Sequence, residues 1–303
     1  MKRGIKVNQI DREKRKNELG LVFSGGGLQG IAHIGAVRAL YELGIRPQYV
    51  AGTSSGSAMA ALVAMGYDAD GMQAFAEKYW TTLADFRPVP IVKQLASLKF
   101  NKKNQKDGLK DGEIISDVIK ESMDAKGIRG FDDLPINLSI CTNDTYTTDE
   151  CIFTTLDEGL QTDHIHYITG APLELAVRAS MTFPAIYTTC SYKQYNFIDG
   201  GSKDNLPTKI MRDMGVGKVL AISFDVMDYV PEKGLEGMLK VVWRALDLYS
   251  VNSTRESKKL ADYCVEIKNS NTAIFSMENL ELTIQEGYEC VMKCKDDLLR
   301  LFK

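Results

Sequence analysis

Residues 19–56 read LGLVFSGGGLQGIAHIGAVRALYELGIRPQYVAGTSSG and contain one local pattern twice. The apolar run 19–23 stops at a glycine turn, and apolar residues three and four apart then recur over 30–41, the spacing of an amphipathic helix. A second apolar run near 48–51 leads into another glycine turn and a predicted helix over 57–66. Two successive strand–turn–helix units predict an α/β fold with a mainly parallel sheet covered by helices on both faces.

The remainder of the chain continues this alternation without an internal repeat, a low-complexity tract or a linker. We therefore expect a single domain over 19–303, preceded by a basic N-terminal tail over 1–18 with seven Lys/Arg and three Asp/Glu. Further strands are predicted at 135–140, 151–155, 195–198, 218–224 and 263–267, and further helices starting at 111–113 and over 172–179, 235–260 and 281–302.

The composition is that of a globular protein, since the 303 residues are 44% hydrophobic and 25% charged. Lys and Arg number 37 against 40 Asp and Glu, a net charge of −3, so no general attraction to nucleic acid is expected. The chain has six cysteines, no apolar signal peptide and no stretch suited to spanning a bilayer. These features predict reduced thiols in a soluble cytoplasmic protein.

The first glycine turn, 25–30 (GGGLQG), ends at Gly30 and matches the G-x-G-x-x-G pattern of dinucleotide-binding sites. Such a site expects an acidic residue about 20 residues further on, at the end of the second strand. Residues 49–52 (YVAG) contain no carboxylate, which disfavours a nucleotide-binding oxidoreductase. Successive backbone N–H groups at a helix N-terminus can equally hold a transient oxyanion. A tight turn without a ligand is the alternative.

The second glycine turn, 52–56 (GTSSG), is a G-x-S-x-G motif between a predicted strand and a predicted helix. In this motif the central serine stands on a strained turn with its Oγ exposed above the sheet. Gly52 and Gly56 leave out side chains that would collide across the turn. Ser54 is therefore the predicted nucleophile, whereas Ser55 can cap the helix that follows.

A serine nucleophile needs a base to accept its proton, and histidine is the usual choice. The chain has three histidines, His33, His164 and His166, and His33 falls in the first helix, where packing is expected. The hydrolase order serine, acid, histidine would need a histidine after Asp199, and none follows it. This scarcity favours a carboxylate as the direct base. Ser54 with an earlier acid and His164 or His166 stays open as an alternative.

Asp199 supplies such a carboxylate, because it follows the predicted strand 195–198 and precedes Gly200 and Gly201. A carboxylate at the tip of a buried strand, followed by glycines, can reach a neighbouring serine turn with little obstruction. An isolated D-G-G would equally cap its own turn, so the prediction depends on the other motifs.

The glycine turn, the G-x-S-x-G motif and the D-G-G segment, in this order, resemble the patatin-like phospholipase family, as does 179–185 (ASMTFPA). The resemblance covers about residues 19–225 and implies a three-layer αβα fold. Within it Gln29 stands where the family commonly has Arg or Lys, and Ser24 where an acidic residue is frequent.

The resemblance also implies chemistry: hydrolysis of lipid acyl esters by a Ser54–Asp199 dyad, without metal or cofactor. The implied oxyanion hole is formed by the backbone of Gly25, Gly26 and Gly27. A thioesterase, a short-chain esterase or an acyltransferase could use the same dyad, and a non-catalytic lipid-binding regulatory protein is the alternative outside enzymes.

A lipid substrate has to be drawn from a membrane or a micelle. Residues 88–106 place apolar residues beside five lysines, and we expect them to form a mobile lid or a transient membrane contact. An ordinary surface excursion is the alternative, and the basic residues 1–16 are a competing membrane contact.

Overall fold

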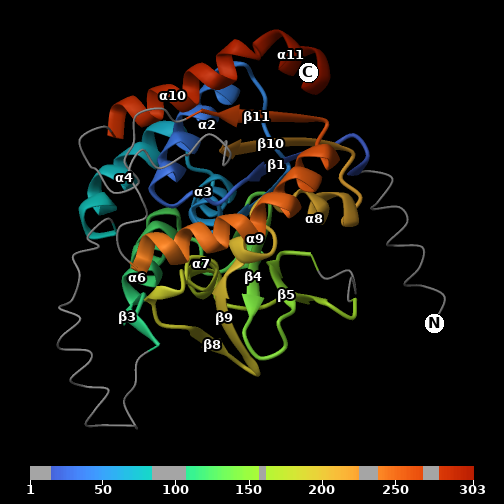
Figure 1. Cartoon of the computed structure of the whole chain (residues 1–303). Helices are drawn as coiled ribbons and strands as arrows, with labels where there is room; N and C mark the ends of the chain where they lie inside the picture. Colours follow the sequence, from blue (N-terminus) through green and yellow to red (C-terminus); the bar gives the residue numbers. More distant parts are fainter. Residues whose placement is uncertain (1–14, 84–106, 157–161, 225–237, 269–279) are drawn as a thin grey trace, which may run out of the picture.

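The computed structural model describes residues 15–83, 107–156, 162–224, 238–268 and 280–303. Its centre is a nine-stranded sheet (Figure 1), whose main path has the order β11-β10-β1-β2-β4-β5-β6. The strands of this path are β1 (Leu19–Phe23), β2 (Tyr49–Thr53), β4 (Asn137–Asp144), β5 (Glu150–Thr154), β6 (Ile165–Ile168), β10 (Lys218–Phe224) and β11 (Tyr263–Ile267).

The strands from β11 to β4 are mutually parallel, with β1 between β10 and β2. Leu21 of β1 pairs with Leu220 on one side and with Val50 on the other. β5 pairs antiparallel with β4, and β6 runs parallel to β5. β9 (Tyr195–Asp199) pairs antiparallel with the last residues of β4 and with β8 (Cys190–Tyr192).

Helices cover both faces of this sheet, so the domain has three layers (Figure 1). Leu21 and Phe23 belong to one core, with α2 (Ala32–Glu42), α3 (Ser55–Ala64) and α10 (Leu280–Lys293). Val22 belongs to the second core, with α8 (Thr208–Asp213), because alternate strand residues face opposite sides. α9 (Met238–Leu260) packs against α8 and against the short helix η3 (Gly200–Ser202). The other elements are η1 (Gly27–Ile31), α4 (Ala69–Leu83), β3 (Gly108–Lys110), α6 (Glu113–Lys126), η2 (Phe131–Asp133), α7 (Leu173–Ser180), β7 (Ala185–Tyr187) and α11 (Lys295–Phe302).

The predicted α/β class with a mainly parallel sheet is confirmed, and β1, β10 and β11 have the predicted bounds. α3 begins at Ser55 rather than at 57, because the chain turns from β2 into the helix at Ser54. The predicted helical character of 281–302 is confirmed, although Cys294, with φ −103° and ψ 9°, separates two helices there, α10 and α11. α4 and the three-residue strands are additional to the prediction, and such short strands have too little periodicity to predict.

The N-terminal part of the described chain is packed rather than free. Arg15 is buried, its Nη1 donates to the Met214 carbonyl at 3.0 Å, and its own carbonyl accepts the Gly217 N–H at 2.9 Å. The packed chain therefore includes 15–18, part of the predicted tail. Residues 1–14 and the predicted lid, 88–106, lie outside the described residues. In the described part of the chain, no helix combines the length and the apolar character needed to cross a membrane.

Candidate active site

Ser54 stands on the turn between β2 and α3, with a left-handed φ of 54° and a ψ of −128°. This conformation costs a non-glycine residue of order 1–3 kcal/mol, so surrounding contacts have to hold it. A Cβ on Gly52 would lie 2.2 Å from the Gly56 carbonyl oxygen, and a Cβ on Gly56 would lie 2.5 Å from the Phe23 carbonyl oxygen. Glycine is therefore required on both sides of the serine.

The Ser54 hydroxyl donates a hydrogen bond to Asp199 Oδ2, with an oxygen–oxygen distance of 2.6 Å. Asp199 ends β9, and its Oδ1 accepts the Gly201 N–H at 2.8 Å. Asp199 is 5% exposed. Its burial raises the pKa of the carboxyl group to about 6, while the hydrogen bonds from Ser54 and Gly201 act to lower it. At neutral pH the group is therefore mostly ionised and able to accept a proton.

The backbone of Asp199 is held by β4 and by the chain after α7. Its N–H donates to the Thr182 carbonyl at 2.9 Å, and the strand pairing sets it opposite Thr142. The Nδ2 of Asn143 donates to the carbonyl oxygens of Asp199 and Gly200, at 3.0 and 3.1 Å. The carboxylate thus reaches Ser54 from a position that the central sheet determines.

The glycine turn after β1 lies beside the serine, since a Cβ on Gly25 would lie 3.2 Å from the Ser54 Cβ. The Gly25 N–H donates to the Asn205 carbonyl at 3.0 Å, and the Gly26 N–H donates to Ser55 Oγ at 3.2 Å. Both amides point to internal partners in this conformation.

The remaining motif glycines lie in two short helices, η1 and η3. Gly27 begins η1 with a φ of 56°, and Gly30, in the same helix, packs on the first residue of α3. Gly200 begins η3 against the Cys141 carbonyl oxygen, which would lie 2.5 Å from a Cβ there. All three predicted motifs therefore meet around Ser54.

The family model for patatin-like phospholipases matches residues 21–212, which contain all three motifs. The chain belongs to the patatin-like phospholipase family. The resemblance expected from the motifs is therefore confirmed.

Individual relatives of this patatin-like chain match different shares of it. The chain is 29% identical over 238 residues to Lysophospholipase NTE1 of Meyerozyma guilliermondii, covering 74% of this chain and 14% of that protein. It is 32% identical over 200 residues to YqhO of Bacillus subtilis, covering 61% of this chain and 64% of that protein. It thus spans less than two thirds of the length of either relative. The crystal structure of VipD from Legionella pneumophila shares the fold, with a TM-score of 0.52, 16% identity and coverage of 93% of this chain and 67% of that one.

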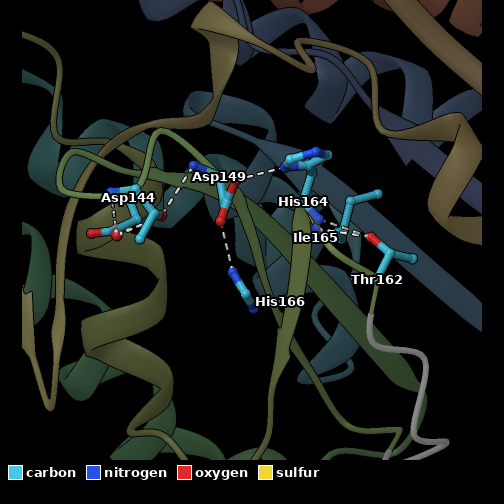
Figure 2. Close-up of polar contacts among 7 residues, drawn as sticks. Asp144, Asp149, Thr162, His164, Ile165 and His166 are labelled. Carbon is cyan, nitrogen blue, oxygen red and sulfur yellow. Dashed lines mark hydrogen bonds and ion pairs between the residues drawn. The ribbon is translucent and has the colours of Figure 1, made fainter.

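Two histidines of this patatin-like domain bond an aspartate outside the Ser54–Asp199 pair. His164 Nδ1 and His166 Nε2 lie 3.3 and 2.9 Å from the two carboxylate oxygens of Asp149 (Figure 2). These bonds, chiefly the one from His166, lower the pKa of Asp149. The Ser54 hydroxyl donates its hydrogen bond to Asp199 rather than to either of these histidines. Within the described ranges, no cluster of three or more His, Cys, Asp or Glu side chains is arranged to hold a metal ion.

His33 is a buried residue of the first helix, α2, as predicted. Its Nε2 lies 2.9 Å from the Ser24 carbonyl oxygen, and its ring contacts those of Phe23 and Phe224. Burial lowers the pKa of His33 to about 4, so the ring is neutral at pH 7 and donates from Nε2. This bond fixes the carbonyl group immediately before the glycine turn.

A second buried acidic residue, Asp204, supports the serine turn through its backbone. The Asp204 carbonyl accepts the Thr53 hydroxyl at 2.8 Å, and its N–H donates to the Gly200 carbonyl at 3.1 Å. Its Oδ1 contacts the Ser257 hydroxyl of α9 at 3.4 Å. Burial, together with the charge of Glu150, raises the pKa of Asp204 to about 7.

Two residues of the site escape prediction from the sequence, Ser180 and Asn143. Ser180 lies in the family-like segment 179–185, and its Oγ accepts a hydrogen bond from the Ser54 N–H. Asn143 is the penultimate residue of the buried strand β4, within the polar run 142–144, at the sheet edge where the motifs meet. That polar run is the signal that could have identified Asn143.

Proposed function

We propose that this protein hydrolyses acyl esters of lipids, with Ser54 as the nucleophile and Asp199 as the base. The proposal depends on the 2.6 Å hydrogen bond between their side chains, made by a serine with left-handed φ at a strand-to-helix turn. A buried carboxylate whose pKa is raised to about 6 is suited to take up the serine proton near neutral pH.

The proposed reaction has two halves. Asp199 takes the proton as the Ser54 Oγ bonds to the ester carbonyl carbon, and the carbonyl π electrons move onto oxygen. When the oxyanion collapses, the carbon–oxygen bond to the alcohol breaks, the alcohol receives the proton from Asp199, and Ser54 is left acylated. Water then gives a proton to Asp199 as it attacks the acyl carbon, and a second collapse releases the acid and returns the proton to the Ser54 Oγ.

We assign the oxyanion hole to the glycine turn. The Gly25 N–H already donates to the Asn205 carbonyl, so the proposed donors are Gly26 and Gly27, with Gly26 exchanging its 3.2 Å bond to Ser55 for the oxyanion. One preorganised donor of this kind is typically worth about 10²–10³ in rate. The N-terminal end of the following helices adds a favourable dipole.

The proposed substrate is a phospholipid with a single acyl chain. The support is the relative named Lysophospholipase NTE1, of which this chain matches 14% of the length. Acyl thioesters and short-chain esters are the competing substrates, because both can form the same acyl-serine.

We propose that α9 contacts the lipid surface. Leu248 and Tyr249 are 63% and 75% exposed on this helix, which packs against η3, directly after Asp199. Amphipathic helices bind the boundary between headgroups and acyl chains through exposed apolar side chains.

The N-terminal residues of the described chain lie away from Ser54. Arg15 precedes β1 at the amino ends of the parallel strands, whereas Ser54 follows the carboxyl end of β2. Residues 15–18 therefore lie at the edge of the sheet opposite Ser54.

Labelling with a fluorophosphonate probe, followed by mass spectrometry of the adduct, tests the nucleophile. We expect one adduct on Ser54 in the wild type and in Ser55→Ala, and no adduct in Ser54→Ala. An adduct that persists in Ser54→Ala would contradict the assignment. Absence of an adduct from folded wild type, with and without phospholipid vesicles, would favour the non-catalytic lipid-binding alternative.

Turnover of three substrates then tests the substrate class. Lysophosphatidylcholine, an acyl-CoA and p-nitrophenyl butyrate are compared with the wild type and with Ser54→Ala as the blank. We expect the highest kcat/KM with lysophosphatidylcholine. A higher value for the thioester would replace the proposed substrate while leaving the dyad in place.

A further inference from the structure

The C-terminal end of α7 contacts both members of the Ser54–Asp199 pair. The Oγ of Ser180, the last residue of the helix, accepts the Ser54 N–H at 2.9 Å and donates to the Cys141 carbonyl at 2.6 Å. Two residues later, the Thr182 carbonyl accepts the Asp199 N–H at 2.9 Å. One short segment therefore bonds the backbone of the nucleophile and the backbone of the base.

The bond from the Ser54 N–H to Ser180 ties a strained residue to a distant part of the chain. The other backbone bonds of Ser54 stay within its own turn: its carbonyl accepts the Ser57 N–H at 2.8 Å and the Ser57 hydroxyl at 2.6 Å. A left-handed φ on a serine persists where surrounding contacts over-determine it. Ser180 is fully buried, so its hydroxyl is well placed to hold that conformation.

The second bond of Ser180 leads to the strand that positions Asp199. The Cys141 carbonyl oxygen lies against Gly200, and the next residue of β4, Thr142, pairs with Asp199. The Thr142 hydroxyl in turn donates to the carbonyl of Ile198, at 2.7 Å. The relay from the Ser54 N–H through the Ser180 hydroxyl to the Cys141 carbonyl thus joins the serine turn to β4 and β9.

We infer that Ser180 is a positioning residue that sets the Ser54 Oγ against Asp199 Oδ2. The inference rests on the function proposed above, and it assigns Ser180 no contact with the substrate. Loss of the hydroxyl leaves the Ser54 N–H and the Cys141 carbonyl without this shared partner in a buried site. The serine turn then relaxes, and the distance between nucleophile and base becomes variable. A misplacement of about 1 Å can cost about 10²-fold in rate.

Kinetics of Ser180→Ala, Ser180→Thr and Ser122→Ala on p-nitrophenyl butyrate test this role. Ser122 is a matched control, because it is also a buried helix serine, and its hydroxyl donates to the Val118 carbonyl of its own helix. For Ser180→Ala we expect kcat to fall about 10²-fold with KM nearly unchanged, and the fluorophosphonate reaction to slow by a similar factor. Ser180→Thr, which keeps the hydroxyl, and Ser122→Ala are expected to retain kcat near the wild-type value.

Thermal unfolding of each variant separates positioning from general destabilisation. Wild-type kcat in folded Ser180→Ala, or an equal loss of kcat in Ser122→Ala, would overturn the inference. The proposed function would still stand if the wild type were active and Ser54→Ala inactive. An inactive wild type would overturn both. If Ser180→Ala does not fold, Ser180→Thr decides: kcat near wild type supports the role, and a large loss at an unchanged Tm refutes it.

Discussion

The proposed role of the buried Asp199 as the base predicts a pH dependence of hydrolysis. The pKa of Asp199 is raised to about 6. About one tenth of the Asp199 carboxyl groups are therefore ionised at about pH 5, and about nine tenths at about pH 7. An aspartate with an ordinary pKa near 3.9 would stay more than about nine-tenths ionised at both values. We therefore expect kcat/KM for a soluble, non-titrating ester to fall about tenfold from pH 7 to pH 5.

The same pKa shift predicts a change in folding stability. The carboxyl group binds its proton more tightly in the folded chain, with a pKa of about 6, than in the unfolded chain, where the ordinary aspartate pKa of 3.8 applies. The free energy of unfolding therefore falls as the pH rises from 3.8 through about 6. At about 1.4 kcal/mol per pKa unit, the full loss is of order 3 kcal/mol at neutral pH. Asp199→Asn removes this loss, so it should unfold at higher urea than the wild type at neutral pH, and the difference should vanish near pH 4.

A second buried acid provides the control for the activity measurement. Asp204 also has a raised pKa, about 7, but its backbone and side chain contact residues other than Ser54. Asp204→Asn should therefore keep an activity midpoint near pH 6. An acid limb with its midpoint below about pH 5 in the wild type, or a limb displaced by Asp204→Asn, would refute the assignment of the base.

Two further substitutions test the supporting structure. Gly56→Ala puts a Cβ 2.5 Å from the carbonyl oxygens of Phe23 and Ser24, so we expect a loss of at least about 1–3 kcal/mol in urea unfolding together with lost fluorophosphonate labelling. Unchanged stability would mean that β1 and α3 are not packed as described. Asn143→Ala removes the side-chain donor to the Asp199 and Gly200 carbonyls, at an expected cost of about 1–3 kcal/mol and a lower kcat. Wild-type kcat in this variant would show that the D-G-G segment is held without it.

Much of the architecture can be predicted from the sequence, because buried parallel strands appear as continuous apolar runs between turns. LGLVF, KVLAISF and YCVEI predict β1, β10 and β11 with their observed bounds. The helix break at Cys294 and the three-residue strands cannot be predicted from such runs. Strands of three residues and a one-residue break are too short for apolar periodicity to predict.

The sequence by itself determined the family and the residue types of the site: a glycine-flanked serine, a run of glycines and an aspartate before two glycines. The tertiary structure alone decided which groups meet. Ser54 and Asp199 are 145 positions apart, and they come within 2.6 Å because β9 pairs with the end of β4 while β2 pairs with its beginning. Burial, which sets the pKa of Asp199, and the contact of Ser180 with the Ser54 N–H arise from the same pairing. A strand register and the desolvation of a carboxylate are properties of the packed domain, so no local stretch of sequence contains them.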